Sequence, residues 1–339
     1  MEGEKQKEPQ GFRSLNRELG LRCLRMITAL EGTGLTQWRR AWRLNRFLQA
    51  VRNLLVDRMM KFPAEPVVCS TIHGFDMLLN PSRDALRGIE PSIFLTGTYE
   101  PGTLHLFRKL LRRGDVVIDI GANIGLMSLY AAKLVGKGGE VMSFEPMTEE
   151  YAILLKNIHL NRFEHVHTYN IALGAKRERK WIYAHPEINR GSSSLVKNSG
   201  GIAVTEVEIT TLDDFLFLHP KKNNIRLVKI DVEGWELEVL KGAKSLLASR
   251  HAPALCVEYS SAHPLEGGQL TEIWDFLSSA NRYRCFKLML GKEKVSKLIP
   301  VRDVSDLPTH DNLFCFLPDQ LEQLEKSAPL IFAQNAAVG

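Results

Sequence analysis

Residues Val116 to Gly125 read VVIDIGANIG, an apolar strand that runs into a glycine-rich turn. Asp119 interrupts the apolar run just before the turn, and an apolar-periodic segment from Leu126 to Leu134 follows as a predicted helix. Gly121 and Gly125 permit backbone conformations and close approaches that a Cβ would block. A strand, such a turn and a helix in succession predict a site where a nucleotide-type ligand lies against the backbone.

The next predicted strand, Val141 to Phe144, carries a second acid at its carboxyl edge, where Glu145 precedes Pro146. A carboxylate about twenty residues past the turn is placed to accept hydrogen bonds from ribose hydroxyls. The cofactor-binding residues predicted around these two strand ends are Asp119, Gly121, Asn123, Gly125 and Glu145.

The turn departs from the dinucleotide fingerprint G-x-G-x-x-G, because Asn123 stands where the second glycine should be. That glycine allows the backbone to approach a pyrophosphate. A nucleoside ligand without a pyrophosphate is therefore favoured. An NAD(P)-dependent oxidoreductase on a similar fold and a non-catalytic protein of the same fold stay open as alternatives.

The chain resembles the FkbM family of S-adenosylmethionine-dependent methyltransferases in three motifs that occur in order. These are the D-x-G-A-N-x-G turn from Asp119, the F-E-P edge at Glu145 and the K-I-D-V-E-G strand end from Lys229. The resemblance covers roughly Thr98 to Pro318. It implies an α/β class I methyltransferase fold, a Rossmann-like doubly wound seven-stranded sheet, with S-adenosyl-L-methionine as cofactor.

The resemblance implies two further pairs of cofactor contacts. Asn170 and Ala172, at the end of the third predicted strand, lie where enzymes of this architecture meet the adenine ring. Tyr99 and Glu100, in the stretch GTYEP, resemble a recurring pair that closes over the methionine half of the cofactor. A plain loop for the first pair, and helix capping with a buried ring for the second, are the structural alternatives.

The segment KIDVEGWE, from Lys229 to Glu236, carries the predicted chemistry. Methyl transfer is an in-line displacement that depends on alignment, and a hydroxyl acceptor also has to lose its proton. Asp231 or Glu233 is assigned to take that proton, while Lys229 lowers the pKa of the acceptor oxygen or pairs with the acids. The alternative is an ion-paired set that only orders the turn.

A metal-assisted reaction is a further alternative, in which Asp231, Glu258 and His263 hold a divalent ion that lowers the pKa of the acceptor hydroxyl. Acids at the carboxyl ends of neighbouring parallel strands converge, which favours Asp231 and Glu258. His263 is a single loop histidine, and the spacing is not diagnostic of a metal. The main assignment therefore contains no metal.

The composition bounds the class of protein. The chain has 339 residues, 44% of them hydrophobic and 24% charged, which suits one large core and a smaller appendage. The polar first residues lack the apolar stretch of a signal peptide, no apolar run is long enough for a membrane span, and the five cysteines are far apart. These features predict a cytoplasmic protein with reduced thiols.

The formal net charge of +5 is concentrated in one segment, because seven basic residues stand against one acid between Thr36 and Phe62. The remainder of the chain is close to neutral, which argues against nucleic-acid binding. Between Gln37 and Met60 the basic and apolar positions form separate stripes of one amphipathic helix. Peripheral contact of residues 36–62 with an anionic membrane, and packing on the catalytic domain or on a second subunit in a homodimer, are both open interpretations.

Four segments are predicted along the chain. Residues 1–62 form a basic helical extension, 63–97 a β-hairpin and connection, 98–318 the methyltransferase domain, and 319–339 a C-terminal tail. The alternation of strands and helices lapses after Gly174, which predicts an inserted β excursion over residues 175–210. We expect O-methylation of a small-molecule, glycan or glycolipid acceptor, selected by this excursion and the hairpin.

Overall fold

The computed structural model describes residues 22, 23, 25, 26, 62–81, 88–184, 193–196, 201–260 and 271–333. The chain divides into two compact units, residues 1–74 with 79–99 and residues 75–78 with 100–339. The predicted basic helix and His263 lie outside the described residues. No helix in the part of the chain that the structure describes is long and apolar enough to cross a bilayer.

The predicted hairpin region contains two short strands on either side of a turn. β1 (Val67–Ser70) and β2 (Asp76–Leu79) occupy the two apolar runs, and the helix α3 (Ile89–Thr96) follows. Gly74, with φ of 74°, donates its N–H to the carbonyl oxygen of Thr71 over 3.2 Å. The positive φ explains why glycine follows His73 at the turn, as the sequence predicted.

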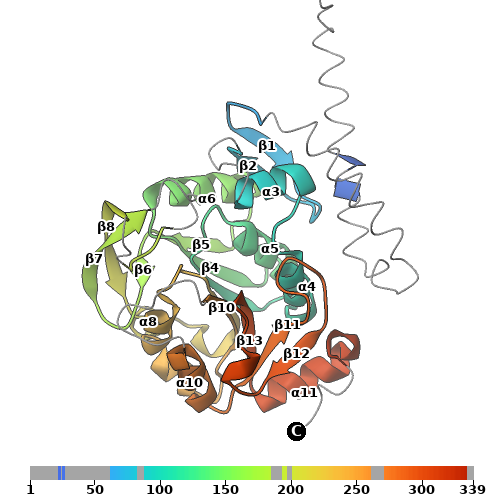
Figure 1. Cartoon of the computed structure of the whole chain (residues 1–339). Helices are drawn as coiled ribbons and strands as arrows, with labels where there is room; N and C mark the ends of the chain where they lie inside the picture. The colour runs from blue at the N-terminus through green and yellow to red at the C-terminus, as the bar shows by residue number, and fades with distance from the viewer. Residues whose placement is uncertain are drawn as a thin grey trace, which may run out of the picture. The chain divides into compact units, whose positions relative to one another are not determined.

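The second unit is built on a mostly parallel sheet, which confirms the predicted fold class (Figure 1). Among the described residues the strand order is β12-β11-β13-β10-β9-β3-β4-β5, with β10 and its neighbours through β5 parallel and the rest antiparallel. The bounds are β3 (Val116–Ile120), β4 (Glu140–Phe144), β5 (Val166–Tyr169), β9 (Ile225–Ile230), β10 (Ala254–Ser260), β11 (Arg284–Leu288), β12 (Leu298–Val301) and β13 (His310–Phe316).

The sheet contains the seven predicted strands and an eighth that the sequence analysis missed. This strand, β12, pairs only with β11 and lies at the edge of the sheet. It has four residues and includes Pro300, a composition that gives little strand signal and is tolerated at an edge.

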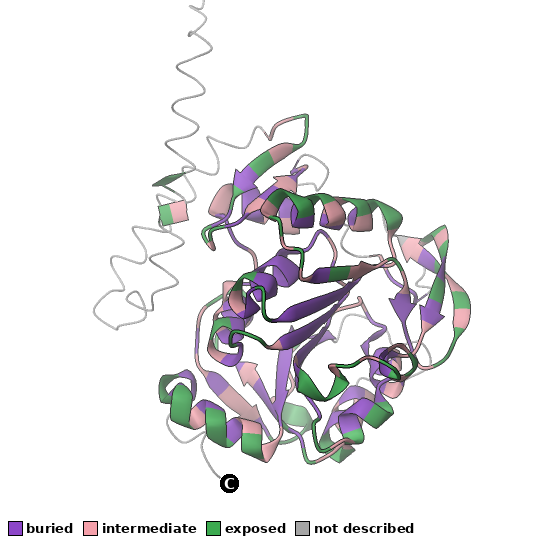
Figure 2. Ribbon diagram, turned by 180° about the vertical axis from the view of Figure 1, so that it is seen from behind, coloured by how far each residue is buried: buried purple, intermediate pink, exposed green. Residues whose placement is uncertain are grey.

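Helices cover both faces of this sheet. The bounds are α4 (Pro101–Leu110), α5 (Leu126–Val135), α6 (Thr148–Asn161), α7 (Leu212–Leu216), α8 (Glu236–Lys241), α9 (Lys244–Ala248) and α10 (Thr271–Ser279). The crossovers through α5 and α6 move away from β3 in one direction, and those through α8 and α10 move in the other. Since such crossovers are right-handed, the two helix sets lie on opposite faces, and the strands between them are buried (Figure 2).

This reversal creates a switch point between β3 and β9, the place where open α/β sheets bind their ligands. The helical segment after β9 is divided into α8 and α9 at Gly242. A Cβ on Gly242 would lie 1.9 Å from the carbonyl oxygen of Gly174, so the chain approaches too closely there for another residue.

The predicted β excursion is present as a separate sheet of β6 (Ala172–Leu173), β7 (Glu178–Ala184) and β8 (Ile202–Thr210), in the order β6-β8-β7. The predicted C-terminal tail differs from expectation in its described part. It contains the helix α11 (Pro318–Ser327), which buries Leu321 and Leu324. Few apolar residues recur at helical spacing in this segment, so its sequence gives only a weak helix signal and predicts a tail.

Candidate active site

The glycine-rich turn joins β3 to α5 through three residues in the left-handed region. Gly121, Asn123 and Gly125 have φ of 80°, 50° and 98°. A Cβ on Gly121 would lie 1.8 Å from the backbone oxygen of Asp231, so glycine is required for the ends of β3 and β9 to meet. The N–H groups of Gly121 and Ala122 donate to the carbonyl oxygen of Phe144 over 3.0 and 2.9 Å. The turn is thereby fixed to the ends of both neighbouring strands.

Glu145 is held in place by backbone donors. Its Oε2 accepts the N–H of Asn123 over 2.8 Å, and its Oε1 accepts the N–H of Met147 over 2.9 Å. The side chain is buried, and burial raises the pKa of Glu145 to about 7 although both N–H groups oppose this. Each carboxylate oxygen accepts one backbone hydrogen bond and keeps a second acceptor position.

Asp119 is also buried, and its partners are not the amides of the turn. Its Oδ2 accepts the hydroxyl of Ser128 over 2.6 Å, and Ser128 in turn accepts the hydroxyl of Ser143 over 2.7 Å. Its Oδ1 lies 3.8 Å from the Nζ of Lys229 and has no hydrogen-bond partner. Burial raises the pKa of Asp119.

Lys229 stands between the two acids of the central strands. Its buried ammonium donates to Oδ2 of Asp231 over 3.0 Å and faces Asp119. Burial alone would lower the pKa of Lys229, but Asp231 and Asp119 raise it above its usual value. For Asp231, burial is outweighed by the charges of Lys229 and Lys292, which lower its pKa to about 2. Lys229 and Asp231 form a permanently charged pair.

The turn after β9 has a strained backbone that a buried acid supports. Glu233 has φ of 56°, a conformation that costs a non-glycine residue about 1 kcal/mol or more. The carboxylate of Glu236 folds back to accept the N–H groups of Val232 (2.9 Å) and Gly234 (3.1 and 3.2 Å). Ser194, from the excursion, donates its hydroxyl to the carbonyl oxygen of Glu233 over 2.5 Å. Two elements thus hold Glu233 in position.

Glu236 is a further site residue that the sequence analysis did not assign. The residue is buried, and burial raises its pKa to about 7. Its place at the start of α8, close behind Gly234, is the signal that could have suggested an acid that folds back onto the preceding turn.

Lys292 is a site residue that the sequence analysis missed. Its buried ammonium lies 2.9 Å from Oε1 of Glu100 and 2.7 Å from Oε1 of Glu258. Glu100 begins α4 and also accepts hydrogen bonds from the side chains of Thr103 (3.1 Å) and Asn312 (3.0 Å). Glu100 therefore uses both oxygens within the protein, although its side chain makes no capping hydrogen bond to the backbone of α4. No motif surrounds Lys292, so only the fold could reveal its position.

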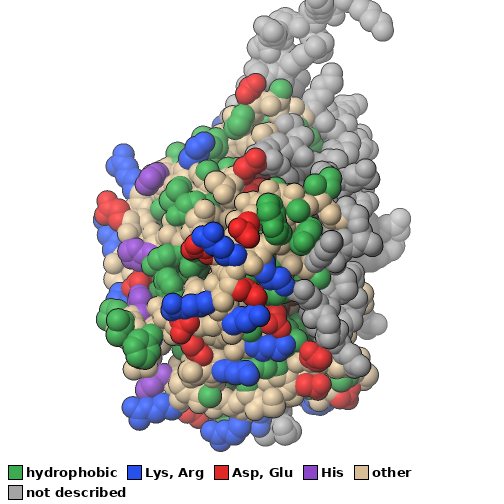
Figure 3. Space-filling model, turned by 90° about the vertical axis from the view of Figure 1, so that its left-hand side faces the viewer, with side chains coloured by type: hydrophobic (Ala, Val, Ile, Leu, Met, Phe, Trp, Pro, Cys, Tyr) green, Lys and Arg blue, Asp and Glu red, His purple; other side chains and the backbone are tan. Residues whose placement is uncertain are grey.

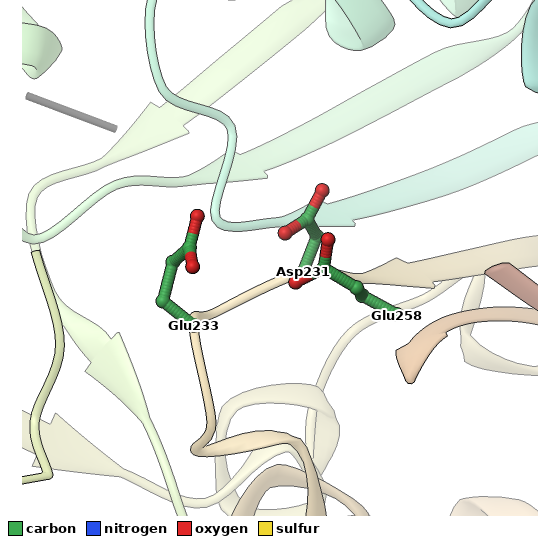
Figure 4. Close-up of side chains that lie close together, drawn as sticks. All are labelled: Asp231, Glu233 and Glu258. Atoms are coloured by element: carbon green, nitrogen blue, oxygen red, sulfur yellow. The ribbon is translucent and has the colours of Figure 1, made fainter. Parts of the chain in front are cut away.

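Three carboxylates converge at the ends of β9 and β10. Asp231, Glu233 and Glu258 each present an oxygen, and these oxygens lie within 4.8 Å of one another (Figure 4). Burial and the charge of Asp231 raise the pKa of Glu233 to about 8 and that of Glu258 well above its usual range. The structure thus places Asp231 and Glu258 together, as predicted, with Glu233 as the third acid near them.

The remaining predicted contacts differ in what the structure supports. The amide of Asn170 donates to the carbonyl oxygens of Glu145 and Pro146 over 2.8 and 3.0 Å, so it braces the end of β4. Ala172 is buried in β6. Tyr99 is partly buried at the end of the first unit. These three residues keep their predicted cofactor role as an untested assignment.

Charges on the face seen in Figure 3 are mixed. Lys and Arg side chains alternate there with Asp and Glu side chains. Among the described residues, exposed ion pairs join Arg177 to Asp214 and Arg179 to Glu208.

Residues 119–285 match the methyltransferase FkbM domain. This chain carries an FkbM methyltransferase domain. The matched range begins at Asp119 and includes the Glu145 and Lys229 motifs, which confirms the family resemblance seen in the sequence. The match favours a methyltransferase over the NAD(P)-dependent oxidoreductase.

Two curated proteins are similar to part of this chain. Methyltransferase sdnD of Sordaria araneosa is 30% identical over 154 residues, which cover 37% of this chain and 59% of that protein. Methyltransferase 1 of Beauveria bassiana (strain ARSEF 2860) is 26% identical over 144 residues, which cover 37% and 57%. The chain thus spans less than two thirds of either relative.

A solved structure is also similar. The crystal structure of methyltransferase FkbM from Methylobacillus flagellatus KT matches 67% of this chain and 52% of that one, with a TM-score of 0.37 and 18% identity.

Proposed function

We propose that the FkbM domain binds S-adenosyl-L-methionine at the switch point and transfers its methyl group to a hydroxyl oxygen. The observation that carries this proposal is the state of Glu145. Its carboxylate is buried at the end of β4, where two backbone N–H groups fix it and leave one acceptor position on each oxygen. Two adjacent ribose hydroxyls are donors of matching number and spacing.

The charge of the neighbouring groups also fits this cofactor. Asp119 keeps a buried oxygen without a hydrogen-bond partner, and Lys229 already faces both Asp119 and Asp231. A buried region with more carboxylates than ammonium groups is costly unless a further cation binds. The sulfonium and amino groups of S-adenosylmethionine carry positive charge, so the residues present suit this ligand.

Glu233 is the residue that we assign to take the acceptor's proton. A general base works best with a pKa near the operating pH, and the pKa of Glu233 is raised to about 8. Asp231, with a pKa of about 2 and an oxygen paired to Lys229, is a much weaker base. Lys229 then fixes Asp231 and does not act on the acceptor itself.

S-adenosylmethionine supplies an electrophilic methyl group on a positively charged sulfur. When the acceptor oxygen forms its bond to the methyl carbon, the carbon–sulfur bond breaks and its electron pair stays on sulfur, giving neutral S-adenosylhomocysteine. The acceptor's proton passes to Glu233. Alignment of the two reactants by the turns at Asp119 and Asp231 accounts for most of the rate, on the order of 7 to 11 kcal/mol of the barrier.

The acceptor is proposed to be a small molecule, glycan or glycolipid, in keeping with the hydroxyl chemistry. The excursion of β7 and β8 contacts the catalytic turn through Ser194 and Glu233, which supports a role in acceptor selection. Cytoplasmic location is retained as part of this proposal, with peripheral membrane contact of residues 36–62, or their packing on the domain or in a homodimer, as the alternatives for the basic segment.

Calorimetric titration with S-adenosylhomocysteine and with NADH tests the cofactor. We expect the first to bind and the second not to bind. Incubation with methyl-labelled S-adenosylmethionine and fractionated cell extract then shows whether label enters lipid, glycan, small-molecule or protein fractions. Binding of NADH alone would refute the proposed function, and binding of S-adenosylhomocysteine without any labelled fraction would indicate a non-catalytic protein.

A further inference from the structure

The ends of β9 and β10 hold an excess of buried negative charge. Among the described residues, five carboxylates there (Glu100, Asp119, Asp231, Glu233 and Glu258) are joined by ion pairs or close approach to only two ammonium groups, Lys229 and Lys292. We call these seven residues the acid–lysine cluster. His310, half exposed and 3.7 Å from Glu258, adds at most one positive charge when it is protonated. The cluster needs further positive charge.

The two lysines leave one region of the cluster without a cation. Lys229 pairs with Oδ2 of Asp231, and Lys292 pairs with Oε1 of Glu258. The other oxygen of Glu258, Oε2, is buried and has no hydrogen-bond partner, while the whole residue is only 4% exposed. Figure 4 shows this carboxyl group beside that of Asp231, with Glu233 across from them. Glu258 thus has one buried oxygen without a hydrogen-bond partner, and its carboxyl group lies within 4.8 Å, oxygen to oxygen, of two further carboxylates.

We propose that Asp231, Glu233 and Glu258 bind a hard divalent cation, Mg²⁺ or Mn²⁺. Carboxylate oxygens are the ligands that these ions prefer, and they commonly keep several water ligands besides. Asp231 and Glu233 are only partly buried, whereas Glu258 is buried, so the ion has a route from the solvent side. Ligand distances of about 2.1 Å require the oxygens to draw together from their present separation, which the two partly buried side chains can accommodate.

This inference rests on the proposed function and deepens it. The sulfonium contributes one positive charge and the divalent ion two, which together offset the excess of three negative charges in the acid–lysine cluster. A hydroxyl oxygen bound to the ion loses its proton more readily.

The competing explanation is that a proton, and not a metal ion, reduces the negative charge. The proton would be bound to Glu258 and would form a hydrogen bond to Asp231. The variant Glu258→Gln separates the two explanations. Its amide N–H replaces the bridging proton and its amide oxygen can still face Lys292, but the amide is a poor ligand for Mg²⁺ or Mn²⁺. If a proton is the answer, this variant is as stable as the parent and neither protein binds the ion.

The experiment is a Mn²⁺ titration of the full chain followed by electron paramagnetic resonance of free Mn²⁺. We expect one site in the parent, competed by Mg²⁺, and binding weakened about tenfold or more in Glu258→Gln. Glu233→Gln is a second variant in case Glu258→Gln does not fold, and Glu238→Gln, an acid of α8 paired with Lys241, is the matched control. The inference would be overturned if the parent had no Mn²⁺ site, or if the parent, Glu258→Gln and Glu233→Gln bound Mn²⁺ equally well.

Titration of the parent with S-adenosylhomocysteine in EDTA separates this inference from the proposed function. If S-adenosylhomocysteine binds but there is no Mn²⁺ site, the metal-site inference is refuted and the methyltransferase proposal stands. If Mn²⁺ binds but S-adenosylhomocysteine does not, the metal-site inference stands and the cofactor assignment is refuted.

Discussion

The two ends of the candidate site hold their carboxylates in different ways. At the ends of β3 and β4, Glu145 is fixed by the backbone N–H groups of Asn123 and Met147. At the ends of β9 and β10, Asp231 and Glu258 are fixed by the ammonium groups of two lysines. The backbone donors lie 22 and 2 residues from Glu145, within one strand–helix–strand unit, and Lys229 lies 2 residues from Asp231, whereas Lys292 lies 34 residues from Glu258. The first end is therefore built within one unit of the chain, and the second also needs a lysine from a separate part of the fold.

The two ends of the site meet at Gly121, so a substitution there should have the largest effect on both of them. In Gly121→Ala the new Cβ would lie 1.8 Å from the backbone oxygen of Asp231, and φ of 80° disfavours alanine. We expect loss of the folded domain or a destabilisation above about 4 kcal/mol, measured by urea unfolding. Gly138→Ala, with no atom within 4 Å of its Cβ, is the control and should stay within about 0.5 kcal/mol. Similar effects in both variants would refute the close approach.

Lys292→Met tests the end that depends on remote residues. The change leaves Glu100 and Glu258 buried without their common cation, which should cost about 3 to 5 kcal/mol of unfolding free energy. Lys241→Met removes a lysine from a partly exposed pair and should cost about 1 kcal/mol or less. A loss in Lys292→Met as small as in the control would show that the acids share protons instead.

Glu145→Gln tests the local end through ligand affinity. The amide nitrogen can no longer accept a ribose hydroxyl, and it faces a backbone N–H group in place of an acceptor. Since a hydrogen bond to a charged group contributes about 1.5 to 3 kcal/mol, we expect S-adenosylhomocysteine to bind roughly 10- to 100-fold more weakly. Calorimetry measures this, and Glu149→Gln, in the first turn of α6, is the control. Unchanged affinity in Glu145→Gln would refute the ribose assignment.

The pH dependence of stability gives the smallest expected effect. Burial raises the pKa of Glu145 and Glu236 from 4.5 to about 7, so the folded protein binds more protons than the unfolded chain between these values. The free energy of unfolding should therefore fall as the pH rises from about 5 to 7.5, by about 1 to 3 kcal/mol for the ligand-free protein. Asp231, with a pKa lowered to about 2, contributes its opposite dependence only below pH 4.

Urea unfolding at pH 5.5 and pH 7.5 measures this change. The variant Glu236→Gln should reduce the dependence, while Glu322→Gln should not, because the pKa of Glu322 is lowered by Lys326 and its effect lies at more acid pH. Stability that rises with pH over this range would contradict the raised pKa values.

The same contrast explains what the sequence could predict. The motifs at Asp119, Glu145 and Lys229 each lie within a short stretch of sequence, so strand, turn and acid could be predicted from neighbouring residues. The order of the motifs along the chain then indicated the fold. Lys292 and Asn312 carry no motif and reach the site only because β13 returns to pair with β10 and the connection between β11 and β12 approaches Glu258. The role of Glu236 depends on a side chain that folds back onto N–H groups of the preceding turn, which its helical position alone does not reveal.

The single hydroxyl of Ser194 has a consequence for how such enzymes diversify. It is the described hydrogen bond that links the excursion to the backbone of the turn holding Glu233, and Glu145 receives its backbone N–H donors from Asn123 and Met147, outside the excursion. An excursion of different length or composition can therefore be exchanged without disturbing the backbone donors that hold Glu145. Because Glu233 is held in a strained conformation, a ligand that shifts Ser194 would also alter the position of the proposed base.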